Sequence, residues 1–276
     1  MTDPVRVREL GRGASATVYE AVHRGARVAF KVLDDPGPHE RAAFERVRGL
    51  AHAGLAGMRE WIDGAGFTMD LVEGGVDVLT WVRGAPPDVV PVGRPNISLA
   101  FGQRQQPEGT SAYTSCDPVG VARLRGALVQ LIEALHYMHG ASILHGDLRP
   151  SNVLVTAEGR VTLLDFGLSR AHDDASSYEA STAYGPPEVV PSPHADWYAL
   201  GTIVFECLTG QLPFLGSAQH VLVTKATVPP PSPSFLVAGV PGDLDALTMG
   251  LLSRNLRVRI VAVDTYRRGL LSSTHP

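Results

Sequence analysis

Apolar residues repeat with two different periods along the chain. Over residues 5–33 they alternate with polar residues, and this period of two predicts three strands. Over residues 39–51 and again over residues 121–138 they recur every three or four positions, which predicts helices. The second helix has a single apolar stripe and is the most strongly patterned element of the chain. The sequence therefore predicts an α+β fold, with strands first and a mainly helical part after them.

Residues 84–117 follow neither period. This stretch carries five prolines together with glycine, glutamine and serine, which predicts a flexible insertion; a segment that docks a partner is the alternative. The length of the chain, residues 1–276, suits a single domain of two lobes. We place the small lobe at residues 1–72, the hinge at about residues 70–74 and the large lobe at about residues 75–270.

Composition narrows the functional classes. The chain is 44% hydrophobic and 19% charged, with a formal net charge of −4 and a pI near 6.2, so we expect no nucleic-acid partner. The first ten residues have no apolar core, so we expect no signal peptide. The most apolar run, residues 198–208, contains Glu206 and is too short to cross a bilayer. Cys116 and Cys207 are too few for a disulfide framework, and we expect a reducing, cytoplasmic setting.

The residues suited to chemistry concentrate between positions 144 and 167. Asp147 and Asn152 stand five residues apart with the cation Arg149 between them. A short apolar hairpin then leads to an Asp-Phe-Gly triplet that begins at Asp165. This arrangement resembles the catalytic loop (H-R-D-x-x-x-x-N) and the metal-binding D-F-G turn of protein kinases. The resemblance implies a bilobal kinase fold and a phosphoryl-transfer reaction.

The same resemblance implies a role for each of these side chains. Asp147 would accept or orient the proton of the attacking hydroxyl, and Arg149 would meet the charge that develops on the phosphate. Asn152 and Asp165 would bind Mg²⁺. Gly146 departs from the pattern, because the family has arginine at this position.

A glycine-rich turn and a nearby strand are the expected ATP site. Gly11 and Gly13 let backbone N–H groups approach phosphates without an intervening side chain. Ala29 and Lys31 share one face of their strand, and the resemblance implies that Lys31 reaches the α- and β-phosphates. The resemblance also implies an ATP pocket that is lined by residues of both lobes and of the hinge. Its further residues would be Val18, Ala29, Met69, Asp70, Val72 and Leu154.

Protein kinases pair this lysine with a glutamate from the first helix, here expected at residues 39–51. Counting back from His52, the usual position falls near Ala43, which is not acidic. A deletion of one or two residues would bring Glu45 into the position, and Glu40 is the alternative. We therefore assign the pairing with the lysine to Glu45.

Three later features resemble the part of a protein kinase that holds a peptide substrate. Pro-Pro-Glu, ending at Glu188, resembles A-P-E, and residues 196–201 resemble D-x-W-x-x-G. The resemblance implies that Arg259 forms an ion pair with Glu188 in the large lobe. Residues 169–182 contain several serines and threonines. Because Gly146 lacks the cation that would bind a phosphate there, we expect activity without phosphorylation of this segment.

These motifs together predict an ATP- and Mg²⁺-dependent protein Ser/Thr kinase that acts on protein substrates, with its oligomeric state left open. The sequences of the motifs are most similar to those of bacterial Ser/Thr kinases. They are particularly similar to the N-terminal kinase domain of large multidomain bacterial regulators, which suggests bacterial signalling. The H-G-D sequence at Gly146 also suits aminoglycoside- or choline-type phosphotransferases. A pseudokinase scaffold is the third hypothesis, although Lys31, Asp147 and the predicted metal ligands are all present.

Overall fold

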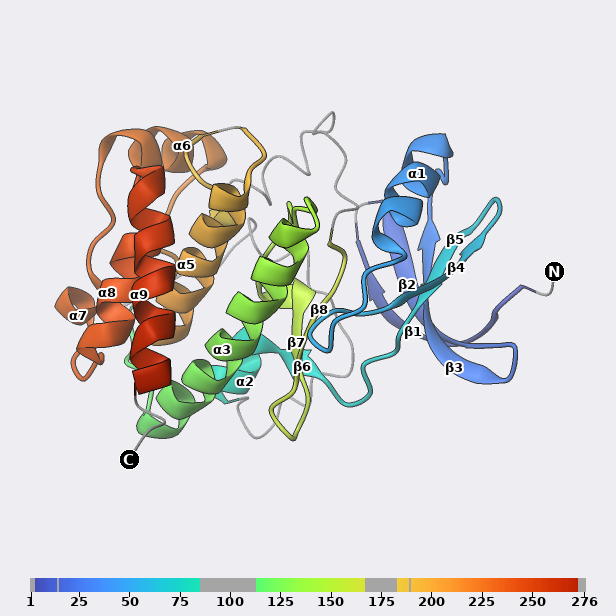
Figure 1. Ribbon diagram of the computed structural model, residues 1–276, viewed down its shortest axis with the longest axis horizontal. Helices are drawn as coiled ribbons and strands as arrows, with labels where there is room; N and C mark the ends of the chain where they lie inside the picture. The colour runs from blue at the N-terminus through green and yellow to red at the C-terminus, as the bar shows by residue number, and fades with distance from the viewer. Residues whose placement is uncertain (1–2, 14, 85–112, 167–182, 189, 273–276) are drawn as a thin grey trace.

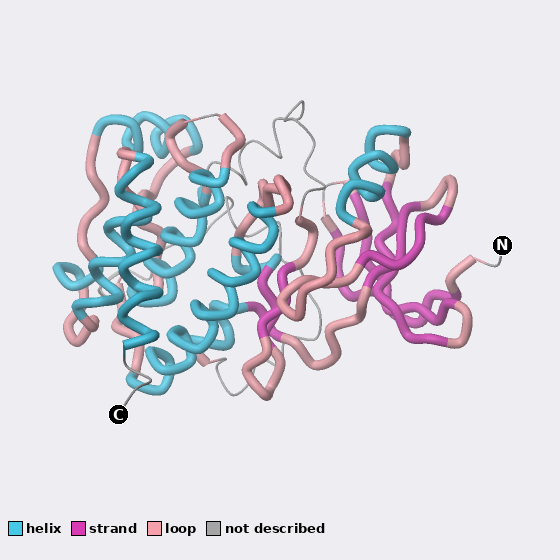
Figure 2. Tube along the Cα trace, viewed as in Figure 1, coloured by secondary structure: helices cyan, strands magenta, loops and turns pink. Residues whose placement is uncertain are grey.

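The computed structural model describes residues 3–13, 15–84, 113–166, 183–188 and 190–272 of the chain. In this part of the chain the strands gather mainly in one lobe and the helices in the other (Figure 1, Figure 2). The α+β class predicted from the two periods and the two-lobe arrangement implied by the kinase resemblance are therefore confirmed.

The small lobe is a five-stranded antiparallel sheet with the strand order β1-β2-β3-β5-β4. Its elements are β1 (Val5–Arg12), β2 (Ala16–His23), β3 (Ala26–Leu33), α1 (Pro38–Val47), β4 (Met58–Ile62) and β5 (Gly66–Met69). The three strands predicted over residues 5–33 are confirmed. Arg24 and Gly25 join β2 to β3 with φ of 51° and 78°, which gives the tight hairpin turn that matches strand twist.

Helix α1 is attached to the small lobe by an aromatic cluster. Its buried residues are Ala43, Phe44 and Val47. The ring centroid of Phe44 lies 5.7 Å from that of Trp61 on β4 and 5.5 Å from that of Phe67 on β5. Such aromatic pairs add about 0.5–1.5 kcal/mol beyond the area they bury, so this cluster sets which face of α1 looks inward.

The large lobe is helical apart from one small sheet, with the strand order β6-β7-β8. Its strands are β6 (Val76–Asp77), β7 (Val153–Val155) and β8 (Val161–Leu163). Its helices are α2 (Val78–Arg83), α3 (Pro118–Gly140), the 3₁₀ turn η2 (Pro150–Asn152), α5 (Pro193–Thr209), α6 (Ala218–Thr227), α7 (Pro233–Leu236), α8 (Gly242–Leu251) and α9 (Leu256–Ser272). The helix predicted over residues 121–138 is confirmed as α3.

Helix α5 forms the centre of the large lobe and is buried from Asp196 to its end. Gly201 allows α8 to approach it, because a Cβ at this position would come within 2.6 Å of the Leu251 side chain. Gly210 ends the helix with φ of 75°, a left-handed conformation that glycine adopts without strain. The position of α5 matters for function because this helix contacts both the catalytic loop and the residues that precede the helix in sequence.

The end of the predicted insertion is anchored to α5. The guanidinium of Arg83 donates to the carbonyl oxygens of Cys207 (2.8 Å) and Thr114 (3.1 Å), and Thr114 N–H donates to Thr209 O (2.8 Å). Asp117 then caps α3 by accepting from Gly120 N–H at 2.6 Å. Residues 113–117, predicted to be flexible, are therefore packed, whereas the rest of the predicted insertion lies outside the described residues.

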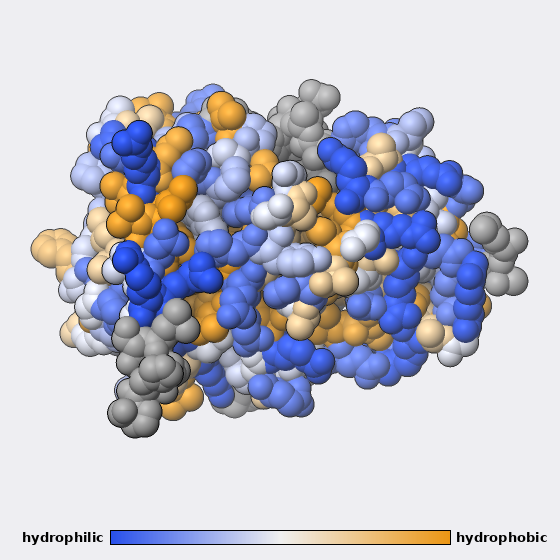
Figure 3. Space-filling view, viewed as in Figure 1, coloured by the Kyte–Doolittle hydropathy of each residue, from blue (hydrophilic) through white to orange (hydrophobic). Residues whose placement is uncertain are grey.

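The visible surface is largely hydrophilic over the small lobe, and an apolar patch lies over the first half of α9 (Figure 3). The patch contains Leu256, Val258, Ile260 and Val261, which are all exposed. Among the described residues, no helix combines the length and the apolar character that crossing a bilayer requires.

Candidate active site

The catalytic loop is fixed to the large lobe by Asp196, in the first turn of α5. One carboxylate oxygen accepts from His145 N–H (2.9 Å) and lies 2.8 Å from His139 Nε2, while the other accepts from Gly146 N–H (3.0 Å). Burial raises the pKa of Asp196. The hydrogen bonds from His139 and from the two backbone N–H groups lower it by more, so the pKa lies below its usual value. Asp196 is therefore an ionised anchor for the backbone that precedes Asp147.

His145 supports the loop from inside. Its ring is fully buried, and burial lowers its pKa, so it is neutral near pH 7. Nδ1 accepts from Asp147 N–H at 3.3 Å, which places the ring proton on Nε2. His145 therefore has a structural role, since it holds the backbone of Asp147.

Asp147 and Asn152 contact each other directly. Asn152 Nδ2 donates to the backbone oxygen of Asp147 (2.7 Å) and to its Oδ2 (3.0 Å). The turn η2 makes this possible, because it brings Asn152 N–H to Arg149 O at 3.0 Å. Arg149 Nε lies 3.6 Å from Asp147 Oδ2. The structure thus brings three of the predicted catalytic-loop residues together in one compact group.

Asp165 joins this group to the small lobe. Leu164 N–H donates to Asn152 O at 2.9 Å, so the residue before Asp165 is tied to the metal-binding asparagine predicted from sequence. Asp165 has φ of 55°, an uncommon conformation for a residue other than glycine, and it lies two residues after the end of β8. Its Oδ1 lies 2.7 Å from Lys31 Nζ on β3, and both side chains are largely shielded from solvent. The predicted lysine and the predicted metal ligand are therefore brought together across the two lobes.

The predicted pairing of Lys31 with Glu45 is wrong in this structure. Glu45 is 47% exposed and its carboxylate lies 3.6 Å from Arg48 on the same helix. The reason is helical geometry: α1 buries Ala43, Phe44 and Val47, and position 45 falls on the opposite side of the helix. The alternative, Glu40, accepts from Gly37 N–H at 3.0 Å and caps the start of α1.

Strand register arranges the residues predicted for the adenine pocket. Ala29 on β3 is paired with Met69 on β5, and Val18 on β2 is paired with Lys31. Ala29 and Met69 are buried. Val72 and Leu154, also predicted for this pocket, both lie close to Gly75. A Cβ on Gly75 would meet Val72 Cγ1 at 2.9 Å and Leu154 Cβ at 3.3 Å. That these side chains contact adenine stays a prediction.

Two acidic residues near the hinge have structural roles. Asp70 is one of the residues predicted for the adenine pocket. Its N–H donates to Gly57 O at 2.9 Å, and its carboxylate accepts from Gly57 N–H and from Arg59 Nε. This leaves its carbonyl oxygen as the group that could meet a ligand. Asp77 caps α2 by accepting from Thr80 N–H at 2.9 Å, which is a structural role.

The glycine-rich turn is held by its own backbone. Gly13 N–H donates to Ala16 O at 2.7 Å, and Gly11 is paired with Val18 across β1 and β2. Ala14 lies outside the described residues. The two predicted glycines therefore lie at the end of the hairpin that precedes β3, as the ATP-site prediction requires.

The predicted Glu188–Arg259 ion pair is confirmed. Arg259 is fully buried on α9, and its guanidinium contacts both carboxylate oxygens of Glu188. The same side chain donates to Ser253 O (2.6 Å) and His194 O (3.0 Å). The stretch that contains Glu188 is thereby fastened to α9 and to the start of α5.

Comparison with known proteins agrees with this geometry. The family model of the protein kinase domain matches residues 107–236. The chain is 30% identical to the serine/threonine-protein kinase PknD of Mycobacterium tuberculosis over 274 residues, which is 93% of this chain and 37% of that protein. The chain is therefore similar to protein kinases over nearly its whole length. It is also 27% identical to PknA of the same species over 248 residues, or 82% of this chain and 51% of that kinase.

A shorter match extends to animal kinases. Ribosomal protein S6 kinase alpha-2 of Mus musculus is 37% identical over 139 residues, which is 46% of this chain and 18% of that protein. The kinase chain described here thus spans between 18% and 51% of the length of these three relatives.

Sequence reasoning missed two buried side chains that hold backbone segments of the large lobe. Asp196 was part of a motif, but its hydrogen bonds to the catalytic loop were not predicted. Lys225 on α6 was not singled out, although it is 2% exposed and contacts the stretch before Glu188. The available signal was its spacing of four from Val221, which places both residues on one helix face.

Proposed function

We propose that this kinase domain transfers the γ-phosphate of ATP to serine or threonine hydroxyls of proteins. The observation that carries the proposal is the arrangement around the β7–β8 hairpin. The Asp147–Asn152 contact lies at its start, and the Lys31–Asp165 contact lies at its end. Phosphoryl transfer depends mainly on positioning and charge neutralisation, and these contacts provide a carboxylate, a cation and two oxygen ligands.

The residues also fit Mg²⁺. The side-chain nitrogen of Asn152 donates to Asp147, so the side-chain oxygen Oδ1 is the atom that would meet a cation. Asp165 adds a carboxylate at the start of its turn. Mg²⁺ prefers oxygen ligands and usually takes one or two from the protein and the rest from water and phosphate. When bound, it would neutralise phosphate charge, with Asn152 and Asp165 holding it.

The other side chains of the loop would act on the protein substrate. Asp147 keeps 37% of its side chain exposed, and Asn152 occupies its Oδ2, so Oδ1 is available to a substrate hydroxyl. There it would orient the hydroxyl and take its proton. Arg149 is close enough to this carboxylate to meet the phosphoryl group as it approaches. Lys31 would hold the other phosphates of ATP.

One observation favours the pseudokinase hypothesis. Helix α1 presents the apolar Ala43 on its inner face and directs Glu45 to solvent, so Lys31 lacks the glutamate that the family usually supplies. Against it, Asp165 already holds Lys31 at 2.7 Å, which keeps the cation oriented. Glycine at position 146 is the feature that favours a small-molecule phosphotransferase. The Glu188–Arg259 pair counts against that hypothesis, because it orders a peptide-binding region.

One experiment separates the three hypotheses. Transfer of radiolabel from γ-labelled ATP is measured on casein, and in parallel on aminoglycosides and choline, with Mg²⁺ present. A protein kinase labels casein, and Asp147→Asn abolishes the labelling while circular dichroism stays unchanged. Labelling of small molecules alone would support the phosphotransferase. ATP binding without labelling of any acceptor would support the scaffold.

We also propose a setting for this activity. ATP is supplied in the cytoplasm, and two relatives that match most of this chain are mycobacterial protein kinases. Both points support a role in bacterial cytoplasmic signalling through protein substrates. Phosphoproteomics of a cell that lacks this protein tests the proposed role. If all Ser and Thr phosphorylation sites persist in that cell, the role is contradicted.

A further inference from the structure

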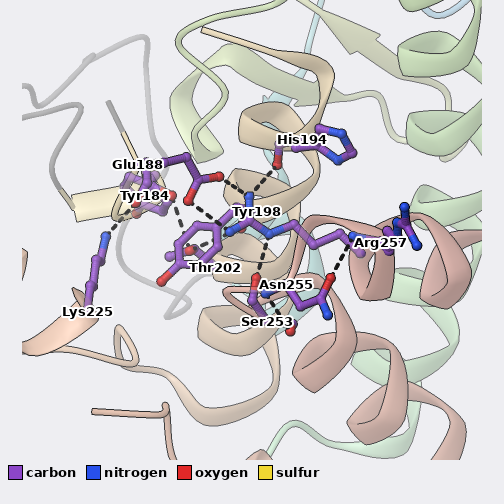
Figure 4. A network of polar contacts seen from close by, with 11 residues as sticks. Tyr184, Glu188, His194, Tyr198, Thr202, Lys225, Ser253, Asn255 and Arg257 are labelled. Atoms are coloured by element: carbon purple, nitrogen blue, oxygen red, sulfur yellow. Dashed lines mark hydrogen bonds and ion pairs between the residues drawn. The ribbon is translucent and has the colours of Figure 1, made fainter. Parts of the chain in front are cut away.

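Lys225 is a buried lysine outside the active site described above. It lies on α6, whose buried residues are Val221 and Lys225, and it is 2% exposed. Its Nζ donates to Ala183 O at 2.9 Å and to Gly185 O at 2.8 Å. Figure 4 shows the Lys225 side chain directed toward Tyr184, the residue between these two. Lysine is seldom fully buried, because removing an ammonium group from water is costly. An apolar side chain would fill this helix face at lower cost, so the contacts with these two carbonyls indicate a specific role.

The stretch contacted by Lys225, residues 183–188, is held at three further points. Tyr184 donates its hydroxyl to Glu206 at 2.7 Å, and Tyr184 O accepts from Thr202 Oγ1 at 3.3 Å. Glu188 at the end of the stretch is bound by Arg259. Lys225 therefore holds the beginning of a stretch whose middle and end are bound by α5 and α9.

Helix α5 links this stretch to the catalytic loop. Tyr198, Thr202 and Glu206 are spaced four residues apart and lie along one face of α5. The Tyr198 ring centroid lies 5.5 Å from Lys225 Nζ and 4.8 Å from the guanidinium carbon of Arg259. The first turn of the same helix carries Asp196, which binds the catalytic-loop backbone. One rigid helix thus sets the distance between residues 183–188 and Asp147.

We propose that Lys225 is a positioning residue for the protein substrate, because it fixes the carbonyls of Ala183 and Gly185 relative to the catalytic loop. The proposal deepens the proposed function and rests on it for its kinetic part. Lys225 touches neither Asp147 nor Lys31, so its loss acts on binding of the protein substrate and leaves binding of ATP intact. Its structural part, ordering of residues 183–188, can be measured without any activity.

The charge of Lys225 adds a second consequence. Burial lowers its pKa to about 7, so the ammonium is protonated below that pH and neutral above it. The charged form interacts more strongly with the carbonyls and with the Tyr198 ring. Wild-type binding of the protein substrate should therefore weaken as pH rises from 6 to 8. Arginine stays charged over this range and should remove that dependence.

The charged and titratable groups of this network lie on four elements. They are Tyr198 and Glu206 on α5, Arg259 on α9, Tyr184 and Glu188 in the stretch 183–188, and His220 on α6. Burial raises the pKa of both tyrosines, so neither ionises near pH 7. His220 is exposed, and a His220→Gln variant should keep the pH dependence that belongs to Lys225.

The test uses Lys225→Met and Lys225→Arg, with Val223→Ala as the control on the exposed side of α6. Hydrogen–deuterium exchange of the peptide that covers residues 183–188 is measured first. Lys225→Met should speed that exchange, whereas Val223→Ala should leave it unchanged. Unchanged exchange in Lys225→Met would overturn the proposal, whether or not the domain phosphorylates casein.

Steady-state kinetics on casein give the second measurement. Lys225→Met should raise KM for casein about tenfold, the usual effect of losing a charge-assisted hydrogen bond, while KM for ATP stays within about twofold. Lys225→Arg should keep KM for casein low from pH 6 to 8. An equal loss of ATP and casein binding would overturn the positioning role. No transfer to casein by wild type would instead contradict the proposed function, and exchange alone would then decide on Lys225.

Discussion

Replacing Arg259 by alanine should destabilise the large lobe more than any exposed substitution nearby. The side chain is fully buried and bridges three parts of the chain: the carboxylate of Glu188, the carbonyl of His194 and the carbonyl of Ser253. It also lies 4.8 Å from the centroid of the Tyr198 ring. Alanine would remove every one of these contacts and leave the acceptors without their donor.

The magnitude follows from what is left behind. Two backbone carbonyls lose hydrogen bonds, at about 1 kcal/mol each. Glu188, with 27% of its side chain exposed, recovers part of its hydration but loses both bonds to the guanidinium. Breaking one partner of a buried ion pair costs about 3–5 kcal/mol in all. For a domain of this size, that corresponds to a fall in melting temperature of roughly 6–20 °C.

Thermal unfolding followed by circular dichroism measures this loss. Arg257→Ala is the matched control, because Arg257 is exposed on the same helix, two residues away. It should melt within about 2 °C of wild type, since exposed substitutions usually change stability little. If Arg259→Ala melts together with Arg257→Ala, the ion pair does not stabilise the lobe and the argument fails.

Three further predictions concern the active site. Lys31→Met should reduce turnover far more than ATP affinity, and near-normal turnover would mean that another cation orients the phosphates. Asp165→Ala should abolish Mg²⁺-dependent transfer with an unchanged circular dichroism spectrum, and undiminished transfer would refute its role as a metal ligand. Because Gly146 supplies no cation, a variant with three serines of residues 169–182 changed should keep its turnover, as should phosphatase-treated enzyme. These serines are Ser176, Ser177 and Ser181, and a large loss on changing them to alanine would show that another group binds a phosphate there.

Local sequence patterns predicted most of the small lobe and the catalytic loop. Strand alternation over residues 5–33 placed Ala29 and Lys31 on β3, where short-range geometry decides which face a side chain takes. The contact between Asp147 and Asn152 follows from one short turn, so spacing in sequence was enough. Lys31 and Asp165 are 134 positions apart, and only the family motif could suggest that they meet.

Helix faces were harder to predict. The sequence alone offered Glu40 and Glu45, and the choice depended on which side of α1 would face the sheet. Phe44 decides it by packing against Trp61 and Phe67, contacts that tertiary structure alone reveals. Lys225 escaped notice for a related reason, since a single lysine in a short helix ordinarily lies on its surface.

The position of Lys31 has a consequence for how this domain would bind its nucleotide. In the described structure the lysine is held by Asp165, and α1 faces the core with Ala43. The carboxylate that orients the phosphate-binding cation is then the one assigned to Mg²⁺. If Asp165 holds Mg²⁺ and Lys31 holds the phosphates of ATP, the contact between these two side chains would have to loosen. This rearrangement would involve β3 and the end of β8 and would need no carboxylate from α1.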